Sequence, residues 1–390
     1  MRRALVLACG IGILLCLGTV YSYSVFRVAL EQTFKVNAVQ SGLPYMLALF
    51  FYALFMPFTG RFIGHFPPQW ISMLGGALMG LGWILAGSFA SFPLFTIFYG
   101  ILGGIGVGIA YGIPLAVAAR MYPEKPGFAI GITVTGFGLS PLVTAPIAQQ
   151  LTRAYGPLTA LRMMGFAFLL LNAILSFFLR FPPSTSSSHR NLTPEWKETP
   201  LKTPKFRILW LLFFIGTFVG LTTIGLTTPV AKEIVGLPYR TAALSISSFA
   251  LFNGLGRPLF GYLSDRKGFR NAALSSYLFL VLALSLFLLG KGNRLVYFLS
   301  FTILWMNLGA WLSIAPSATL QLFGPEIYAR TYGLLFTAYG CAALAGTFLA
   351  GLLRDLTGSY LSIFLVNLFL VFLGLGTLLF WEKERVGGCP

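Results

Sequence analysis

The composition of this 390-residue chain indicates a protein embedded in a membrane, because 57% of its residues are hydrophobic and only 9% are charged. Soluble proteins carry roughly a quarter charged residues, so a soluble enzyme or binding domain is excluded. The formal net charge of +17 does not indicate a nucleic-acid partner, because the basic residues lie in short loops between apolar runs. The four cysteines show no metal or redox spacing, and we expect no cofactor and no metal.

Twelve apolar runs follow one another along the chain, and most have about 20 or more residues, the length of a membrane-spanning helix. Shorter strands would be needed for a barrel, so we expect an all-α membrane protein with twelve transmembrane helices. The first run follows Met1-Arg2-Arg3 and has no clear cleavage site, which indicates a retained helix and not a signal peptide. The expected spans are 4–26, 42–64, 70–90, 94–119, 127–151, 161–181, 207–231, 241–264, 271–290, 295–322, 329–353 and 359–381.

A polar segment with the run Pro-Pro-Ser-Thr-Ser-Ser-Ser separates the sixth and seventh runs. We therefore predict an N-terminal six-helix half at 1–181, a linker at 182–206 and a C-terminal six-helix half at 207–390. The halves also repeat, because a shift of 202 positions pairs Glu31 with Glu233 and Gly138 with Gly340. Six spans is an even number, so the repeats are parallel, and a substrate site is expected between them near the midplane.

The loop charges predict the orientation of the chain. With a cytoplasmic N-terminus, 17 basic residues fall in inside segments and 9 in outside segments. The positive-inside rule then places both termini and the linker in the cytoplasm, with the protein in a plasma or inner membrane.

The eighth span carries the most unfavourable residue of the chain, Arg257, whose insertion costs about 2.5 to 3.5 kcal/mol even on the lenient scale. It lies eight residues before Asp265, hence about 12 Å from the end of the span and close to the midplane. Asn253 is one helical turn earlier, on the same face. A buried arginine inside a span indicates an anion-binding site; the alternative is a structural arginine bonded to backbone carbonyls. Arg27 and Lys232 are expected near outer helix ends, reaching the interface.

The turn Gly261-Tyr-Leu-Ser-Asp-Arg-Lys-Gly-Phe-Arg270 resembles the loop motif of the major facilitator superfamily. That resemblance implies two six-helix repeats, with Asp265 and Arg266 acting as a conformational latch and not as substrate contacts. The first-half counterpart, residues 60–65, is degraded and lacks the aspartate.

Two further stretches resemble branches of that superfamily. The segment 18–26, with Tyr21 and Tyr23, resembles the first helix of the oxalate/formate antiporters. The run Asn253-Gly-Leu-Gly-Arg257-Pro resembles the Asp-x-x-x-Arg-Pro run of the monocarboxylate transporters, which implies that Arg257 is the substrate arginine. Asn253 stands where those relatives have an aspartate implicated in proton coupling.

The number of buried cations narrows the expected substrate. Oxalate antiporters carry a second buried cation, a lysine in the eleventh span, and this chain has none between Tyr332 and Ala342. One guanidinium matches one carboxylate, and a dianion would leave a buried charge unpaired. We therefore expect a proton-coupled symporter of small monocarboxylates such as lactate or pyruvate, functional as a monomer; the alternative is an oxalate/formate-type antiporter.

Further side chains are candidates for lining the site, with core packing as the alternative for each. Tyrosine hydroxyls can bind a carboxylate, and aromatic faces can enclose a short alkyl chain. No obvious buried carboxylate is available to carry the proton. An enzyme is not expected, because the two histidines lie near loops without a metal or nucleophile cluster. The candidates are Tyr21, Tyr23, Tyr111, Asn307, Trp311, Phe336 and Tyr339.

Overall fold

The computed structural model describes residues 3–62, 66–122, 126–181, 203–290, 292–324 and 327–386, which are almost entirely helical. The N-terminal helices are α1 (Arg3–Leu17), η1 (Gly18–Ser22), α2 (Tyr23–Phe34), α3 (Ala38–Phe62), α4 (Pro68–Ser88), α5 (Phe92–Phe95), η2 (Thr96–Leu102), α6 (Gly103–Met121), α7 (Pro126–Tyr155) and α8 (Pro157–Phe177). The C-terminal helices are α9 (Pro204–Glu233), α10 (Tyr239–Leu289), α11 (Arg294–Phe323), α12 (Tyr328–Thr357) and α13 (Leu361–Val386).

The described helices account for the twelve expected spans. Eleven helical stretches are long and apolar enough to cross a membrane, and one of them, α10, has 51 residues. Gly268 interrupts α10 with φ 79° and ψ 152°, a positive-φ conformation that glycine adopts without strain. Both ends of α10 lie at the same end of the molecule, because a Cβ on Gly292 would be 3.5 Å from the carbonyl oxygen of Ile234. α10 therefore crosses twice, and the all-helical fold expected from the sequence is confirmed.

The first span is longer than the sequence indicated. α1, η1 and α2 form one apolar stretch from Arg3 to Phe34, whereas residues 4–26 were expected. The extension brings Arg27 inside the span, and its side chain is only 1% exposed. The expectation that Arg27 reaches out to the interface is therefore wrong.

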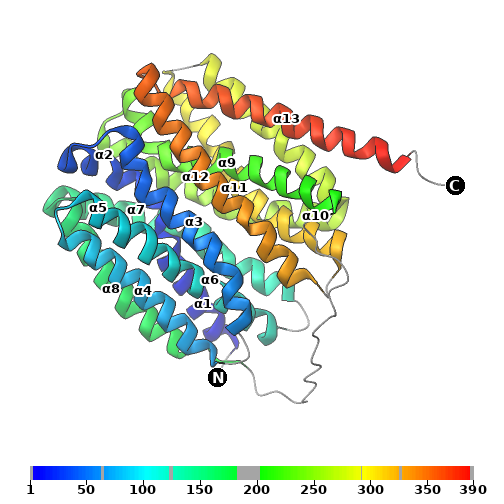
Figure 1. The fold of residues 1–390 in the computed structure, drawn as a ribbon, viewed down its shortest axis with the longest axis horizontal. Coiled ribbons are helices and arrows are strands. Elements are labelled where there is room, and N and C mark those ends of the chain that lie inside the picture. The colour runs from blue at the N-terminus through cyan, green and yellow to red at the C-terminus, as the bar shows by residue number, and fades with distance from the viewer. Residues whose placement is uncertain are drawn as a thin grey trace.

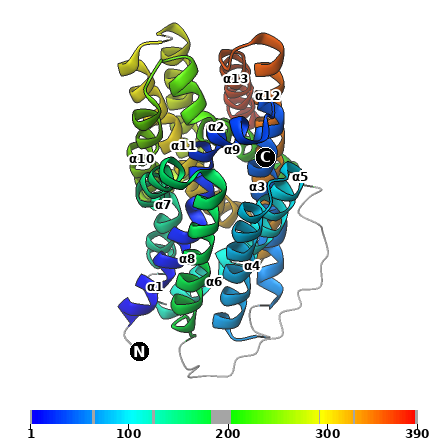
Figure 2. The ribbon, with the colours of Figure 1, turned by 90° about the vertical axis from the view of Figure 1, so that its left-hand side faces the viewer.

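Helices pack across the boundary between the halves, most extensively α3 with α12 and α7 with α10, and also α2 with α9; Figures 1 and 2 show α3 lying beside α12. The contacts follow the repeat found in the sequence. A Cβ on Gly138 of α7 would be 2.8 Å from Arg257 of α10, and one on Gly340 of α12 would be 2.9 Å from Ala53 of α3. The 202-residue shift maps Gly138 onto Gly340, so equivalent glycines permit equivalent close approaches. The domain boundaries stay a prediction, because residues 182–202 lie outside the described chain.

Large apolar side chains cover much of the outer surface. Examples are Phe166 on α8, 59% exposed, and Phe369 on α13, 69% exposed. Apolar surface on this scale is expected where lipid, and not water, is the solvent. Several polar and charged side chains, among them Arg27, Asn253 and Arg257, are buried inside the molecule.

Candidate functional site

Arg257 lies at the contact between α10 and α7, with its side chain only 2% exposed. Its Nη1 donates a hydrogen bond to the carbonyl oxygen of Val134 on α7 at 2.8 Å, so the guanidinium bridges the two halves. Its Nη2 makes a longer bond of 3.4 Å to Asn253 Oδ1. The amide nitrogen of Asn253 donates to the carbonyl oxygen of Trp305 at 2.9 Å. Asn253 therefore serves Arg257 as an acceptor here.

The third nitrogen of the guanidinium, Arg257 Nε, is buried and has no hydrogen-bond partner among the described residues. Burying a charged donor without a partner is unfavourable, so this atom is ready for an acceptor that the protein does not supply. Gly138 covers that edge of the guanidinium, and a Cβ there would be 2.8 Å from Nε. Separation of α7 from α10 would therefore expose the unpaired donor.

Aromatic side chains from five spans form a cluster next to this arginine, which we call the aromatic cluster: Tyr21, Tyr52, Tyr111, Phe137, Phe336 and Tyr339. The hydroxyls of Tyr21 and Tyr339 are hydrogen-bonded at 2.8 Å, joining the first and second halves. Phe137 precedes Gly138 and contacts Tyr21 and Tyr111 with ring centroids 5.1 and 5.3 Å apart. The cluster therefore supplies apolar faces and four tyrosine hydroxyls beside the Arg257 guanidinium, and two of these hydroxyls are paired with each other.

The structure brings five of the expected binding residues together: Arg257, Asn253, Tyr21, Tyr111 and Tyr339. Phe336 joins them, with its ring centroid 4.9 Å from that of Tyr339. Trp311 lies one layer behind; its ring is 6.4 Å from Phe213, which in turn contacts Phe336. The indole Nε1 of Trp311 is buried without a partner among the described residues.

Two expected residues are placed elsewhere. Tyr23 donates to the carbonyl oxygen of Ser41 at 2.7 Å and stacks on Tyr45. Asn307 is engaged with Ser276, which donates to its Oδ1, while its Nδ2 donates to the Ser276 carbonyl oxygen at 3.2 Å. Asn307 therefore does not contact Arg257. Its side chain instead holds α11 against the second crossing of α10.

Sequence reasoning missed Tyr52, Phe137 and Gly138 as members of the site. Tyr52 follows two phenylalanines in the second span, and the local sequence does not separate it from aromatic residues that face lipid. Gly138 carried a signal, because it was one of the residues repeated in the second half. Its closeness to Arg257 required the packing of α7 on α10, which no local pattern indicates.

A second buried cation, Arg27, lies about 9 Å further along the first span than Tyr21. Its guanidinium donates to Glu31 at 3.3 Å, to Ser41 Oγ at 3.0 Å and to the carbonyl oxygen of Ala38 at 2.8 Å. Glu31 balances its charge, so Arg27 does not add a free cation to the site. Burial raises the pKa of the neighbouring Tyr360 phenol to about 12, so this group stays neutral beside Arg27.

Hydrogen bonds between the halves close the end of the molecule where α3 begins; we call this end the Arg27 end. Arg27 Nη1 donates to the carbonyl oxygen of Gly225 on α9 at 3.3 Å, and Tyr239 donates to that of Val25 at 2.7 Å. Both carboxylate oxygens of Asp355 on α12 accept from the first backbone N–H groups of α3, each at 3.2 Å. A carboxylate at a helix N-terminus also interacts favourably with the helix dipole.

The residues predicted to form a latch lie at the other end and are exposed. Arg266 packs over the ring of Tyr262, 5.2 Å from its centroid. Asp265 has no hydrogen-bond or ion-pair partner within the described chain, and residues 63–65 of the first-half loop lie outside it. The latch therefore stays a prediction.

The fold and the buried guanidinium between two helical halves are typical of a membrane transporter. The sequence matches the model of the Major Facilitator Superfamily over residues 7–322 and 241–389. The chain belongs to this superfamily and is a transporter, not an enzyme.

Similar proteins share this architecture. The chain is 28% identical to the oxalate:formate antiporter of Oxalobacter formigenes over 340 residues, covering 86% of this chain and 81% of the antiporter. It is 24% identical to monocarboxylate transporter 12 of Homo sapiens over 381 residues, covering 88% of this chain and 73% of that protein. A crystal structure of the nucleoside transporter NupG superposes with a TM-score of 0.76 at 14% identity, covering 97% of this chain and 99% of NupG.

Proposed function

We propose that this protein is a secondary active transporter of small monocarboxylates such as lactate or pyruvate, working as a proton symporter by alternating access. The observation that carries the proposal is Arg257 itself. It is a permanently charged, buried donor at the contact between the halves, and its Nε has no partner among the described residues.

Arg257 has the chemistry that carboxylate binding needs. A guanidinium presents a planar fork of donors that matches a carboxylate with two parallel hydrogen bonds. The substrate replaces the Val134 carbonyl, which accepts from Arg257 at 2.8 Å when the halves are packed together. The bound anion neutralises the guanidinium and so lowers the cost of closing a dry site around it.

The charge balance of the cluster favours one carboxylate over two. Arg257 is the one cation beside the aromatic cluster in the described structure, because Arg27 is paired with Glu31. A dicarboxylate would leave one negative charge without a partner in a low-dielectric site. The aromatic faces fit the short alkyl part of a monocarboxylate, and the Tyr21–Tyr339 hydroxyl pair can bond a hydroxyl or keto oxygen.

The route of the proton follows from where the described acids lie. Glu31 is paired with Arg27, Glu233 with Arg354, and Asp355 caps α3, so none of them contacts Arg257. We propose that the proton travels on the substrate carboxyl group. If the chain has the orientation that the loop charges predict, the Arg27 end faces the outside and both termini face the cytoplasm.

Oxalate/formate-type exchange is the second candidate, favoured by the 28% identity to the Oxalobacter formigenes antiporter. Uptake of labelled lactate, pyruvate, formate and oxalate into proteoliposomes tests the two against each other. An inward pH gradient is expected to accelerate lactate or pyruvate uptake several-fold. Uptake that is independent of the pH gradient but requires oxalate or formate inside the vesicle would establish exchange instead.

A further inference from the structure

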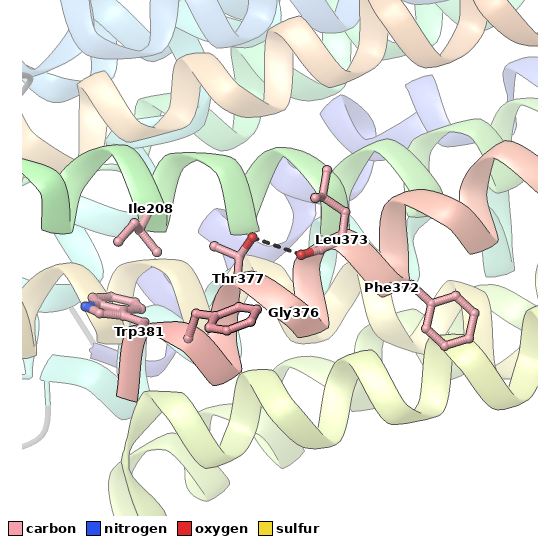
Figure 3. Close-up of a pocket in the computed structure, with 7 residues that line it drawn as sticks. Ile208, Phe372, Leu373, Gly376, Thr377 and Trp381 are labelled. Carbon is pink, nitrogen blue, oxygen red and sulfur yellow. Dashed lines mark hydrogen bonds between the residues drawn. The ribbon is translucent and has the colours of Figure 1, made fainter. Parts of the chain in front are cut away.

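A hollow lies on the outer surface between α9 and α13, with a volume of about 470 Å³. This is within the range of about 300–1,000 Å³ typical of sites for small organic ligands. Figure 3 shows Ile208 of α9 on one side and Phe372, Gly376 and Trp381 of α13 on the other. The hollow is far in sequence from Arg257 and plays no part in the proposed transport site.

Apolar side chains form the walls of the hollow, and the side-chain-free Gly376 forms its floor. A Cβ on Gly376 would meet nothing within 4 Å, so the missing side chain creates the space. The hydroxyl of Thr377 donates to the carbonyl oxygen of Leu373 at 2.9 Å, so its donor is already satisfied within α13. Such a surface attracts a hydrocarbon chain and not a polar solute.

The hollow runs along the helix axes for nearly half the thickness of the hydrocarbon core of a bilayer. Phe372 and Trp381 are nine residues apart, hence about 13 Å on a helix, whereas half of the hydrocarbon core is about 15 Å. Trp381 contacts Phe269 with ring centroids 5.7 Å apart. Tryptophan at this place is typical of the membrane–water interface, so the Trp381 end is the mouth at the headgroup level.

Basic side chains surround that mouth. Lys205 and Arg207 are exposed in the first turns of α9, next to Ile208. Arg270 reaches α13, with Nη2 3.5 Å from the carbonyl oxygen of Leu378. Asp265 is the acidic residue described near this end of α10, and the residues that follow Trp381 on α13, Glu382-Lys383-Glu384-Arg385, are balanced in charge. The mouth is therefore positive, which complements a phosphate group.

We propose that an anionic phospholipid of the cytoplasmic leaflet binds between α9 and α13. One acyl chain lies in the hollow over Gly376, and the headgroup phosphate lies against Lys205. The proposal takes from the proposed function only the orientation of the chain, and it holds whatever the transported solute is.

Native mass spectrometry of the purified full-length protein tests the proposal, with phosphatidylglycerol and phosphatidylcholine of identical acyl chains as probes. The wild type is expected to retain phosphatidylglycerol about fivefold more strongly or better, as one or more lysine–headgroup contacts imply. Gly376→Leu fills the hollow and is expected to abolish this tight binding. Gly131→Leu is the matched control, because a Cβ at Gly131 also meets nothing within 4 Å.

A second pair of variants tests the headgroup contact. Lys205→Gln is expected to lower the preference for phosphatidylglycerol, whereas Lys267→Gln removes the same charge from an exposed position on α10 and is expected to leave it unchanged. Equal retention of the two lipids by the wild type, or unchanged binding by Gly376→Leu, would overturn the proposal. A doubled protein mass that Gly376→Leu abolishes would also overturn it, by assigning the hollow to a second copy of the chain.

Discussion

Gly138 offers the sharpest perturbation of the proposed site, because alanine there adds one methyl group against Arg257. That methyl would lie 2.8 Å from Arg257 Nε, 2.8 Å from Asn253 Oδ1 and 3.2 Å from Arg257 Cζ. Carbon atoms do not approach so closely, and Nη1 of the same arginine is tied to Val134. The guanidinium must shift, or α7 must move away from α10.

The size of the effect follows from the cost of overpacking a buried contact, about 1–3 kcal/mol. That energy corresponds to roughly a 5- to 160-fold change in an equilibrium constant. In the proposed mechanism α7 and α10 close on the bound substrate in every transport cycle, so we expect a rise in KM and a fall in maximal rate within this range. Initial rates of labelled lactate or pyruvate uptake into proteoliposomes measure both.

Gly131→Ala is the matched control, since it lies on the same helix and its Cβ would meet nothing within 4 Å. Thermal unfolding of both variants, followed by tryptophan fluorescence, separates a loss of function from a loss of fold. Transport by Gly138→Ala within twofold of Gly131→Ala would refute the view that α7 closes directly on Arg257.

Three further changes probe the cluster and the closed Arg27 end. Tyr339→Phe removes one hydroxyl of the 2.8 Å pair with Tyr21, and its loss of about 0.5–1.5 kcal/mol should raise KM roughly two- to twelvefold; the exposed Tyr155→Phe is the control, and an equal KM in both would exclude a role in binding. Asn253→Asp places a carboxylate at the 3.4 Å contact with Arg257, where it competes with the substrate. Uptake by this variant should fall most at neutral pH and recover as the pH is lowered. A pH profile identical to that of the wild type would contradict the contact between residue 253 and Arg257. Asp355→Asn weakens the cap on α3, worth about 0.3–1 kcal/mol, and should increase labelling of a cysteine at the buried position Thr347 by an impermeant thiol reagent about two- to fivefold, in a background without native cysteines. Unchanged labelling would show that this cap does not hold the Arg27 end closed.

The sequence predicted the fold well because membrane helices are set by a local property, a continuous apolar length. Arg257 was identifiable for the same reason, since a charge inside an apolar run is conspicuous without any knowledge of packing. The superfamily motif at 261–270 added the arrangement of the halves.

Features that depend on contacts between distant helices were not predictable. Arg27 appeared to end a span, and only the continuation of the helix to Phe34, with Glu31 and Ser41 around it, makes it a buried and balanced cation. Asn307 resembled a site residue, yet a serine 31 positions earlier engages its amide. Tyr52 and Phe137 carry no local signal, because an aromatic residue in a membrane helix is equally suited to lipid, core or substrate.

The central claim is that the Arg257 guanidinium binds the substrate carboxylate. Uptake of labelled lactate and pyruvate by Arg257→Ala, Arg257→Lys and the exposed control Arg153→Ala tests it most directly. Two charge-assisted hydrogen bonds of about 1.5–3 kcal/mol each predict that Arg257→Ala loses at least about 100-fold in transport efficiency, that Arg257→Lys retains part of it, and that Arg153→Ala matches the wild type. Transport by Arg257→Ala within twofold of Arg153→Ala would contradict the account.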